Sequence, residues 1–172
     1  VEKVSLVSED ENISYITPTR NPLSCTVVIV ETGHNIWLYD TGSHSDIPAM
    51  INSYNQAGKN INIVLSHFHP DHIKNVSDIH FMNMYQGKNT LRYTGTGEIV
   101  TDDLYIDDDI MLHIFPIASS HAKGCLALEV KDICYVGDAL YPATGPQFRR
   151  YNAGLLLEQL RKIESCNAKY IS

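Results

Sequence analysis

Hydrophobic runs alternate with turn residues through the first part of the chain. Residues 25–40 contain two β-rich runs joined by a turn with Gly and Asn, which predicts a β-hairpin. Apolar side chains recur at helical spacing from residue 46 to about 58, so we expect a helix there, with Ser45 or Asp46 at its start. Residues 61–65 predict a short buried strand that leads directly into a polar segment.

The middle of the chain carries several short strand-like runs. Residues 81–85, 91–93 and 110–115 are β-rich and are separated by Gly, Asn and Asp, so we expect a strand in each. The acidic stretch from 102 to 109 lacks the regular ligand spacing and the terminal Glu of a calcium loop. We therefore expect a solvated loop there.

A second hairpin and the clearest helix follow. Residues 125–130 and 133–136 predict two strands joined by a tight turn. Residues 152–164 place Leu and Ile side chains on one face, which predicts a helix with Asn152 as its cap. A last strand is expected at 168–172.

This order of elements favours a layered α/β fold with helices outside and sheets inside, in one domain over residues 1–172. No apolar run approaches the roughly 20 residues that span a bilayer, so we expect no membrane association. The net charge of −7 and the lack of Lys/Arg clusters argue against a nucleic-acid partner. The four cysteines form no CxxC pair, which favours reduced thiols and a cytoplasmic location.

A cluster of metal-binding side chains follows the strand at 61–65. It offers three imidazoles and one carboxylate, from His67, His69, Asp71 and His72. This mixture suits zinc or another first-row transition metal. In extended backbone the first two histidines point to the same side, while Pro70 forces a bend that can turn the following Asp and His elsewhere. The spacing itself predicts two metal positions.

Four sequence blocks resemble the metallo-β-lactamase superfamily. Its HxHxDH signature is present as His67-Phe68-His69-Pro70-Asp71-His72. The other blocks are a strand ending in Asp40, the loop histidine His121, and Asp138 after a hydrophobic strand. They occur in the order of the family. The resemblance implies a four-layer αββα sandwich, truncated at its C-terminus because the family's last block is missing.

The resemblance also implies a ligand set for two divalent metal ions, with zinc expected first and manganese or iron as alternatives. In that set His67, His69 and His121 hold the first metal, Asp71 and His72 hold the second, and Asp138 bridges both. Asp40 is not expected to be a ligand. Its carboxylate either orients a ligand or loop through hydrogen bonds, or stabilises the turn before Thr41.

One departure from the family concerns the second metal. The family usually places a further His just after the next strand, which here is the run from Lys169 to Ser172. We therefore expect the second position to be one ligand short. If the natural chain continues, the missing His should lie a residue or two beyond Ser172.

Two metals about 3.5 to 4 Å apart would generate a hydroxide near neutral pH, so the resemblance implies hydrolysis. Asp71 could hold the hydroxide and then protonate the leaving group. Tyr141 is placed like the substrate-polarising Tyr of acyl-homoserine lactonases in this superfamily, although it could instead be a packed aromatic. We expect a small-molecule ester, thioester or lactone as substrate. The alternatives are an iron-dependent oxidoreductase and a metal-binding module without catalysis.

Other polar residues are expected to play lesser parts. Three histidines should be structural or solvent-facing, namely His34, His80 and His113. Three cations could attract an anionic substrate but are more often solvated at such places, namely Lys123, Arg149 and Arg150.

Overall fold

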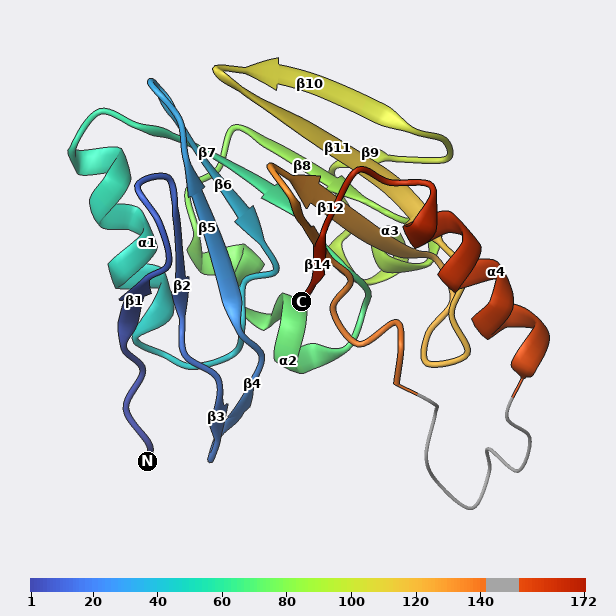
Figure 1. Ribbon diagram of the computed structural model, residues 1–172. Coiled ribbons are helices and arrows are strands. Elements are labelled where there is room, and N and C mark those ends of the chain that lie inside the picture. Colours follow the sequence, from blue (N-terminus) through green and yellow to red (C-terminus); the bar gives the residue numbers. More distant parts are fainter. Residues whose placement is uncertain (142–151) are drawn as a thin grey trace.

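The computed structural model describes residues 1–141 and 152–172, and two β-sheets form its centre (Figure 1). The first sheet has seven strands in the order β1-β2-β5-β6-β7-β8-β9. Their bounds are Leu6–Ser8, Ile13–Ile16, Val27–Glu31, Asn35–Tyr39, Asn60–Val64, Asn83–Gln86 and Glu98–Ile99. Pairing is antiparallel from β1 to β6 and parallel from β6 to β9. Because β6 and β7 are parallel, the segments that follow them leave the sheet at the same edge.

The second sheet has five strands in the order β10-β11-β12-β13-β14. Their bounds are Leu104–Asp108, Ile110–Ile117, Cys125–Val130, Ile133–Tyr135 and Tyr170–Ile171. All its pairs are antiparallel except β13 with β14. A separate two-stranded ribbon pairs β3 (Thr19–Arg20) with β4 (Leu23–Ser24).

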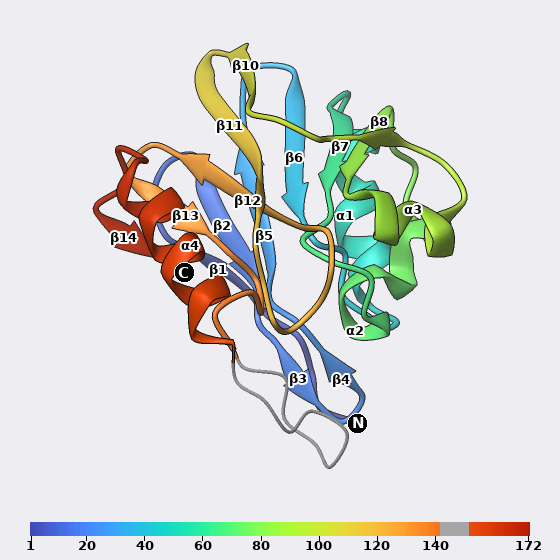
Figure 2. The same ribbon diagram turned by 90° about the vertical axis from the view of Figure 1, so that its right-hand side faces the viewer.

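Helices cover the outer faces of the two sheets (Figures 1 and 2). Helix α1 (Ile47–Gln56) lies on the first sheet, and α4 (Ala153–Glu164) lies on the second. Three short helices follow strands of the first sheet, namely α2 (Pro70–Ile73), the 3-10 helix η1 (Lys74–Asp78) and α3 (Lys88–Thr94). The expected four-layer αββα sandwich is thereby confirmed.

Alternation along the strands explains the layers. In β6, Ile36 and Leu38 pack under α1, while Trp37 and Tyr39 face the second sheet. Successive side chains of a strand point to opposite faces, so a strand buried on both sides must be apolar at nearly every position. A third apolar cluster, which includes Phe115 and Ile163, fills the space under α4.

Most of the expected elements are confirmed. The hairpins are β5–β6 and β12–β13, and the two long helices are α1 and α4. Asn152 caps α4 through its side chain, which accepts a hydrogen bond from the Leu155 backbone N–H at 3.2 Å. Asp46 occupies the N-cap position of α1 but makes no side-chain capping bond.

Two expectations were wrong. Residues 91–93 belong to helix α3 rather than to a strand, since Gly87 starts the helix and Gly95 ends it with a left-handed φ of 71°. The acidic stretch 102–109 contains strand β10, not a solvated loop. Its Asp108 accepts hydrogen bonds from Trp37 Nε1, Asn35 and Thr32. Partners in the first sheet thus anchor a carboxylate that looks solvated in the sequence.

No helix in the described ranges is both long enough and apolar enough to pass through a membrane.

Candidate metal centre

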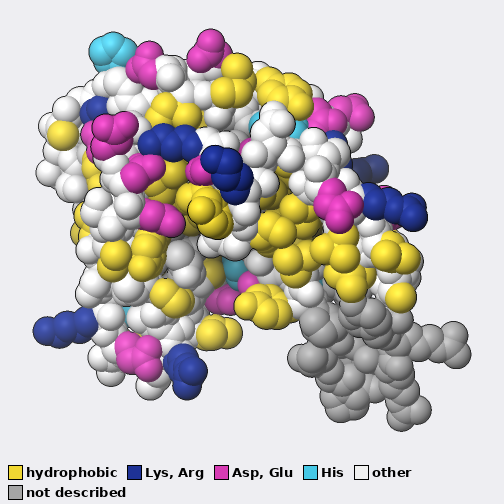
Figure 3. Space-filling model, viewed as in Figure 1, with side chains coloured by type: hydrophobic (Ala, Val, Ile, Leu, Met, Phe, Trp, Pro, Cys, Tyr) yellow, Lys and Arg dark blue, Asp and Glu magenta, His cyan; other side chains and the backbone are white. Residues whose placement is uncertain are grey.

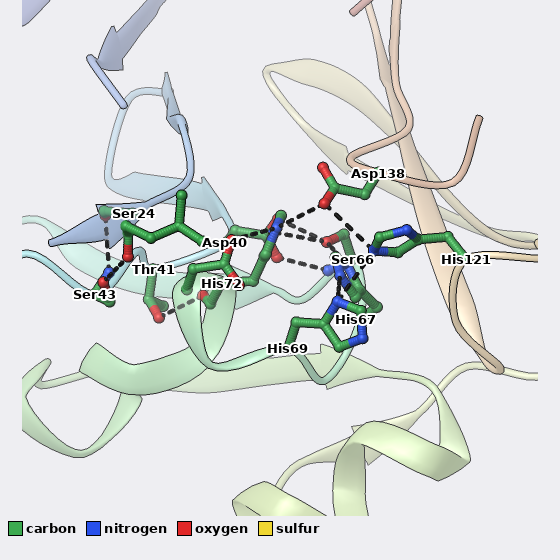
Figure 4. Close-up of polar contacts among 12 residues, drawn as sticks. Ser24, Asp40, Thr41, Ser43, Ser66, His67, His69, His72, His121 and Asp138 are labelled. Carbon is green, nitrogen blue, oxygen red and sulfur yellow. Dashed lines mark hydrogen bonds and ion pairs between the residues drawn. The ribbon is translucent and has the colours of Figure 1, made fainter. Parts of the chain in front are cut away.

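The candidate ligands meet at one edge of the sandwich (Figure 4). The segment 66–72 follows β7, His121 lies in the loop between β11 and β12, and Asp138 follows β13. Each of these segments continues from a buried strand, so the sheets fix where the polar residues begin. Both sheets therefore contribute donors to one centre.

Three imidazole nitrogens lie together at the candidate first metal position. His67 Nε2 lies 3.0 Å from His69 Nδ1, and His69 Nδ1 lies 3.0 Å from His121 Nε2. All three lie within 4.8 Å of one another. Such convergent nitrogens cannot all pair with one another as donor and acceptor, whereas a cation accepts a lone pair from each. The donor set fits zinc or another first-row metal.

The surroundings of His67 keep its ring neutral. Ser66 Oγ donates to Asp40 Oδ2 at 2.7 Å, so the same hydroxyl accepts from His67 Nδ1 at 2.9 Å. This arrangement puts the proton of His67 on Nδ1 and leaves the lone pair of Nε2 facing the other histidines. Burial, together with the nearby His72, lowers the pKa of His67 to about 3. The ring is thus in the form that binds metal.

Carboxylates surround the second position. Helix α2 starts at Pro70 and turns the chain, so that His72 Nε2 lies 3.5 Å from Asp71 Oδ2 and 3.5 Å from Asp138 Oδ2. Burial opposes a charge on His72, yet the carboxylates of Asp40 and Asp138 raise its pKa well above the usual range. The site therefore favours positive charge, which a metal ion would supply in place of a proton.

Asp138 lies between the two positions. Its Oδ2 is 3.4 Å from His121 Nε2 of the first position and 3.5 Å from His72 Nε2 of the second. The hydrogen bond with His72 lowers the pKa of Asp138, so its carboxyl group is ionised near neutral pH. One carboxylate is thus close enough to serve both positions.

Asp40 forms hydrogen bonds with the candidate ligand His72 and with Ser66, which contacts His67. Its side chain is buried, with a residue exposure of 1%, and it accepts from Ser66 N and Ser66 Oγ, each at 2.7 Å. It also accepts from His72 Nδ1 at 2.7 Å. The backbone of Asp40 has a left-handed φ of 65°. The carboxylate contacts Ser66 and His72, which corresponds to the first of its two expected roles, the orientation of a ligand through hydrogen bonds.

Two further residues of the site carry no strong sequence signal. Ser66 links Asp40 to His67, and only its place directly before the motif could have pointed to it. Ser119 Oγ accepts from the His121 backbone N–H at 3.0 Å and donates to the Ala139 carbonyl at 2.9 Å. It thereby joins the loop of His121 to the segment after Asp138.

One ring nitrogen of His121 has no partner among the described residues. Its Nδ1 is buried and makes no hydrogen bond to any of them. Metal-binding histidines usually donate their second N–H to an oxygen, and His67 has such a contact with Ser66 Oγ. We therefore expect the orientation of His121 to depend more on an ion than that of His67.

Two hollows flank the centre. One has a volume of about 370 Å³ and is lined by Asp71, His72 and Asp138 together with Tyr141. Figure 3 shows histidine and acidic side chains in a hollow bordered by hydrophobic ones. The other, of about 630 Å³, adjoins His69 and is mainly apolar. Several candidate ligands thus line the smaller hollow, whereas the larger one borders His69 alone among them.

The remaining candidates lie away from the ligands or at their margin. Tyr141 lines the first hollow, and its side chain is largely exposed at 65%. Lys123 is exposed, and so are His34 and His80, whereas Arg149 and Arg150 lie outside the described residues. His113 is buried in a hydrogen-bond network on the second sheet.

Comparisons with known proteins agree with this geometry. Residues 20–81 match the family model of the metallo-beta-lactamase superfamily, and this range includes the motif at 67–72. No curated protein sequence matches the chain.

Solved structures share the fold at low identity. A variant of a metallo-beta-lactamase from Cronobacter sakazakii has a TM-score of 0.72 at 16% identity, over 98% of this chain and 79% of that one. A metallo-beta-lactamase from Pontibacter korlensis has a TM-score of 0.61 at 12% identity, over 77% of this chain and 70% of that one.

A variant flavo di-iron protein from Thermotoga maritima has a TM-score of 0.68 at 13% identity, covering 98% of this chain. The chain spans 56% of the length of that protein. At these identities the likeness concerns the fold, which is common to enzymes with different reactions. Residues 20–81 thus resemble the metallo-beta-lactamase superfamily in sequence, and the chain shares its fold with solved metallo-beta-lactamases and a flavo di-iron protein.

Proposed function

We propose that the chain is a metal-dependent hydrolase that acts on a small-molecule ester, thioester or lactone at a two-metal centre. The position of Asp138 carries this proposal. Its Oδ2 lies 3.4 Å from His121 Nε2 and 3.5 Å from His72 Nε2, between two groups of donors. A carboxylate shared in this way suits two neighbouring divalent ions.

The chain's own residues would hold the ions in place. His67, His69 and His121 would bind the first ion, and Asp71, His72 and Asp138 would complete the arrangement. Divalent ions there would supply a water acidic enough to react near neutral pH and would polarise the bond that is attacked. Zinc suits these donors, and so do manganese and iron.

Asp71 is the residue best placed for proton transfer. Its carboxylate lines the 370 Å³ hollow, and its side chain is 22% exposed, so it can reach both the centre and a bound molecule. We assign it the acceptance of a proton from the attacking water and the return of that proton to the leaving group. The strongly basic alkoxide that leaves from an ester or lactone benefits from such an acid, whereas the thiolate that leaves from a thioester depends on it less.

The hollow itself supports a small substrate. Its volume is within the range of small-molecule sites, and it combines Tyr141 and the acidic donors with apolar side chains such as Leu23 and Val28. The Tyr141 hydroxyl could donate a hydrogen bond to the oxyanion that forms during attack on a carbonyl. These features favour a carbonyl compound with an apolar portion.

The test combines metal content with turnover. Purified protein should contain zinc or manganese and should hydrolyse at least one member of a panel of esters, thioesters and lactones. Asp138→Asn should abolish turnover, whereas Asp78→Asn, a matched change at an exposed aspartate, should leave it intact. Iron together with oxygen consumption and no hydrolysis would favour an oxidoreductase instead. No turnover with any loaded metal would favour a binding module.

A further inference from the structure

A second group of metal-binding side chains lies on the outer face of the second sheet, away from the centre. His113 of β11 and Glu129 of β12 are directly opposite each other in the strand register, and Cys166 follows α4. Their ligand atoms all lie within 4.8 Å of one another. We propose that His113, Glu129 and Cys166 form a zinc-binding site distinct from the metal centre.

Hydrogen bonds already orient the donors for this role. His113 Nε2 lies 2.6 Å from Asp103 Oδ1 and can donate its proton there, which leaves the lone pair of Nδ1 for the ion. A carboxylate behind a histidine is a common feature of zinc sites. Glu129 Oε1 accepts from the Asn167 backbone N–H at 2.8 Å, while Oε2 lies 2.8 Å from His113 Nδ1. These two atoms are hydrogen-bond partners in the absence of an ion, and a bound cation would take the place of the proton between them.

The charges balance around a divalent ion. One carboxylate and one thiolate neutralise Zn²⁺, and the nearby Asp103 is paired separately with Lys162 Nζ at 2.7 and 2.9 Å. Without an ion, burial and the Glu129 carboxylate raise the pKa of the Cys166 thiol to about 11. A cation between them would reverse this effect, because metal binding favours the thiolate. Sulfur, imidazole and carboxylate together are typical zinc ligands.

An ion can reach the group from solvent. A cavity of about 230 Å³ is lined by His113, Glu129 and Tyr105, and the Tyr105 ring stacks on the imidazole with centroids 4.2 Å apart. Three protein donors leave one tetrahedral position, which a water in this cavity could occupy. Bound zinc would join the turn after α4 to β11 and β12.

The zinc content of variants tests the site. Metal-free protein should be reloaded with excess zinc under a non-chelating reductant, desalted and analysed for zinc per chain. Cys166→Ser should lower the content by one equivalent relative to the unaltered chain, and Glu129→Gln should do the same. Glu164→Gln, a matched change at an exposed glutamate near the same turn, should leave the content unchanged.

Cobalt supplies a second readout that does not depend on activity. Thiolate coordination to Co²⁺ gives a charge-transfer absorption in the near ultraviolet, which should be lost in Cys166→Ser and retained in His121→Ala. Circular dichroism would establish that each variant is folded. Equal zinc contents in the unaltered chain and in folded Cys166→Ser would overturn the proposal, and so would a cobalt–thiolate absorption of unchanged intensity in that variant.

Discussion

Histidines at both positions of the candidate metal centre lie near the Asp40 carboxylate, yet they favour different protonation states. Asp40 Oδ2 contacts His72 Nδ1 directly at 2.7 Å, and the pKa of His72 is raised. It reaches His67 only through the Ser66 hydroxyl, and the pKa of His67 falls to about 3. Burial and the neighbouring His72 lower the pKa of His67, whereas Asp40 and Asp138 raise the pKa of His72 against the effect of its burial. The protonation state of each imidazole therefore depends on the groups around it.

Removal of a ligand from the first metal position, where the His67 ring is neutral, should have the largest effect on metal content and turnover. His67→Ala deletes one of three convergent nitrogens, so we expect loss of the first metal and roughly a 1000-fold fall in kcat/KM, equivalent to several kcal/mol of lost charge stabilisation. Metal analysis and kinetics on the substrate identified by the panel would measure both. His34→Ala, at an exposed histidine, is the control and should behave like the unaltered chain.

Asp40→Asn tests whether the Asp40 carboxylate affects metal affinity at both positions. The variant keeps the side-chain shape but loses the charge next to His72 and the strong acceptor for Ser66 Oγ. We expect metal affinity to fall by about 10- to 100-fold, as for other partners behind metal ligands. Competition with a chelator would measure this change. Unchanged affinity in both positions would contradict the role assigned to Asp40.

In the metal-free chain, the contributions of His72 and His67 to the free energy of unfolding should change in opposite directions with pH. The folded-state pKa of His72 is raised, so its contribution to stability is present below the unfolded-state pKa of about 6.5 and is lost as pH rises above that value. The lowered pKa of His67 has the opposite effect, because its neutral form becomes less costly as pH rises from about 3 to 6.5. Each contribution should change by at most about 1.4 kcal/mol per pH unit.

Denaturant unfolding of metal-free protein from pH 5 to 8 would measure these contributions. The free energy that His72→Gln loses relative to the unaltered chain should shrink above pH 6.5. The stability of the unaltered chain relative to His67→Gln should increase as pH rises toward 6.5. If both differences changed in the same direction, the contrast between the two positions would be wrong.

Tyr141→Phe should give the smallest effect. Tyr141 lines the hollow, but it is 65% exposed, so a hydrogen bond from its hydroxyl would act in nearly aqueous surroundings. We expect a fall in kcat of roughly tenfold or less, with the metal content unchanged. A loss of metal in this variant would show a role in the structure of the second position instead.

The sequence predicted those parts of the fold whose patterns are long or strongly periodic. The helix at 153–164 and the β12–β13 hairpin are examples. Residues 91–93 were misassigned because a short apolar run fits a strand or one turn of helix equally well. Strand β10 was missed because its acidic residues concealed an alternating pattern, and their partners lie in the other sheet.

For the site, the sequence placed the candidate ligands in blocks, and the structure brings those blocks to one edge. The contacts behind the ligands were harder to foresee. Ser66 lies 26 residues after Asp40, and only the parallel pairing of β6 with β7 brings the two together. His113 is buried and hydrogen-bonded, which agrees with the structural role expected for it, but its partners Asp103 and Glu129 could not be identified from the sequence. Motif spacing cannot show such contacts across strands.

Asp40 combines a left-handed backbone conformation, which favours Gly, with a side chain that contacts the candidate ligand His72. A residue with a Cβ in that conformation costs roughly 1 to 2 kcal/mol, and Gly would relieve the cost. Gly, however, would remove the carboxylate that Ser66 and His72 share. Selection for thermal stability alone and selection for metal retention should therefore favour different residues at position 40, and a variant library screened separately for each property would diverge there.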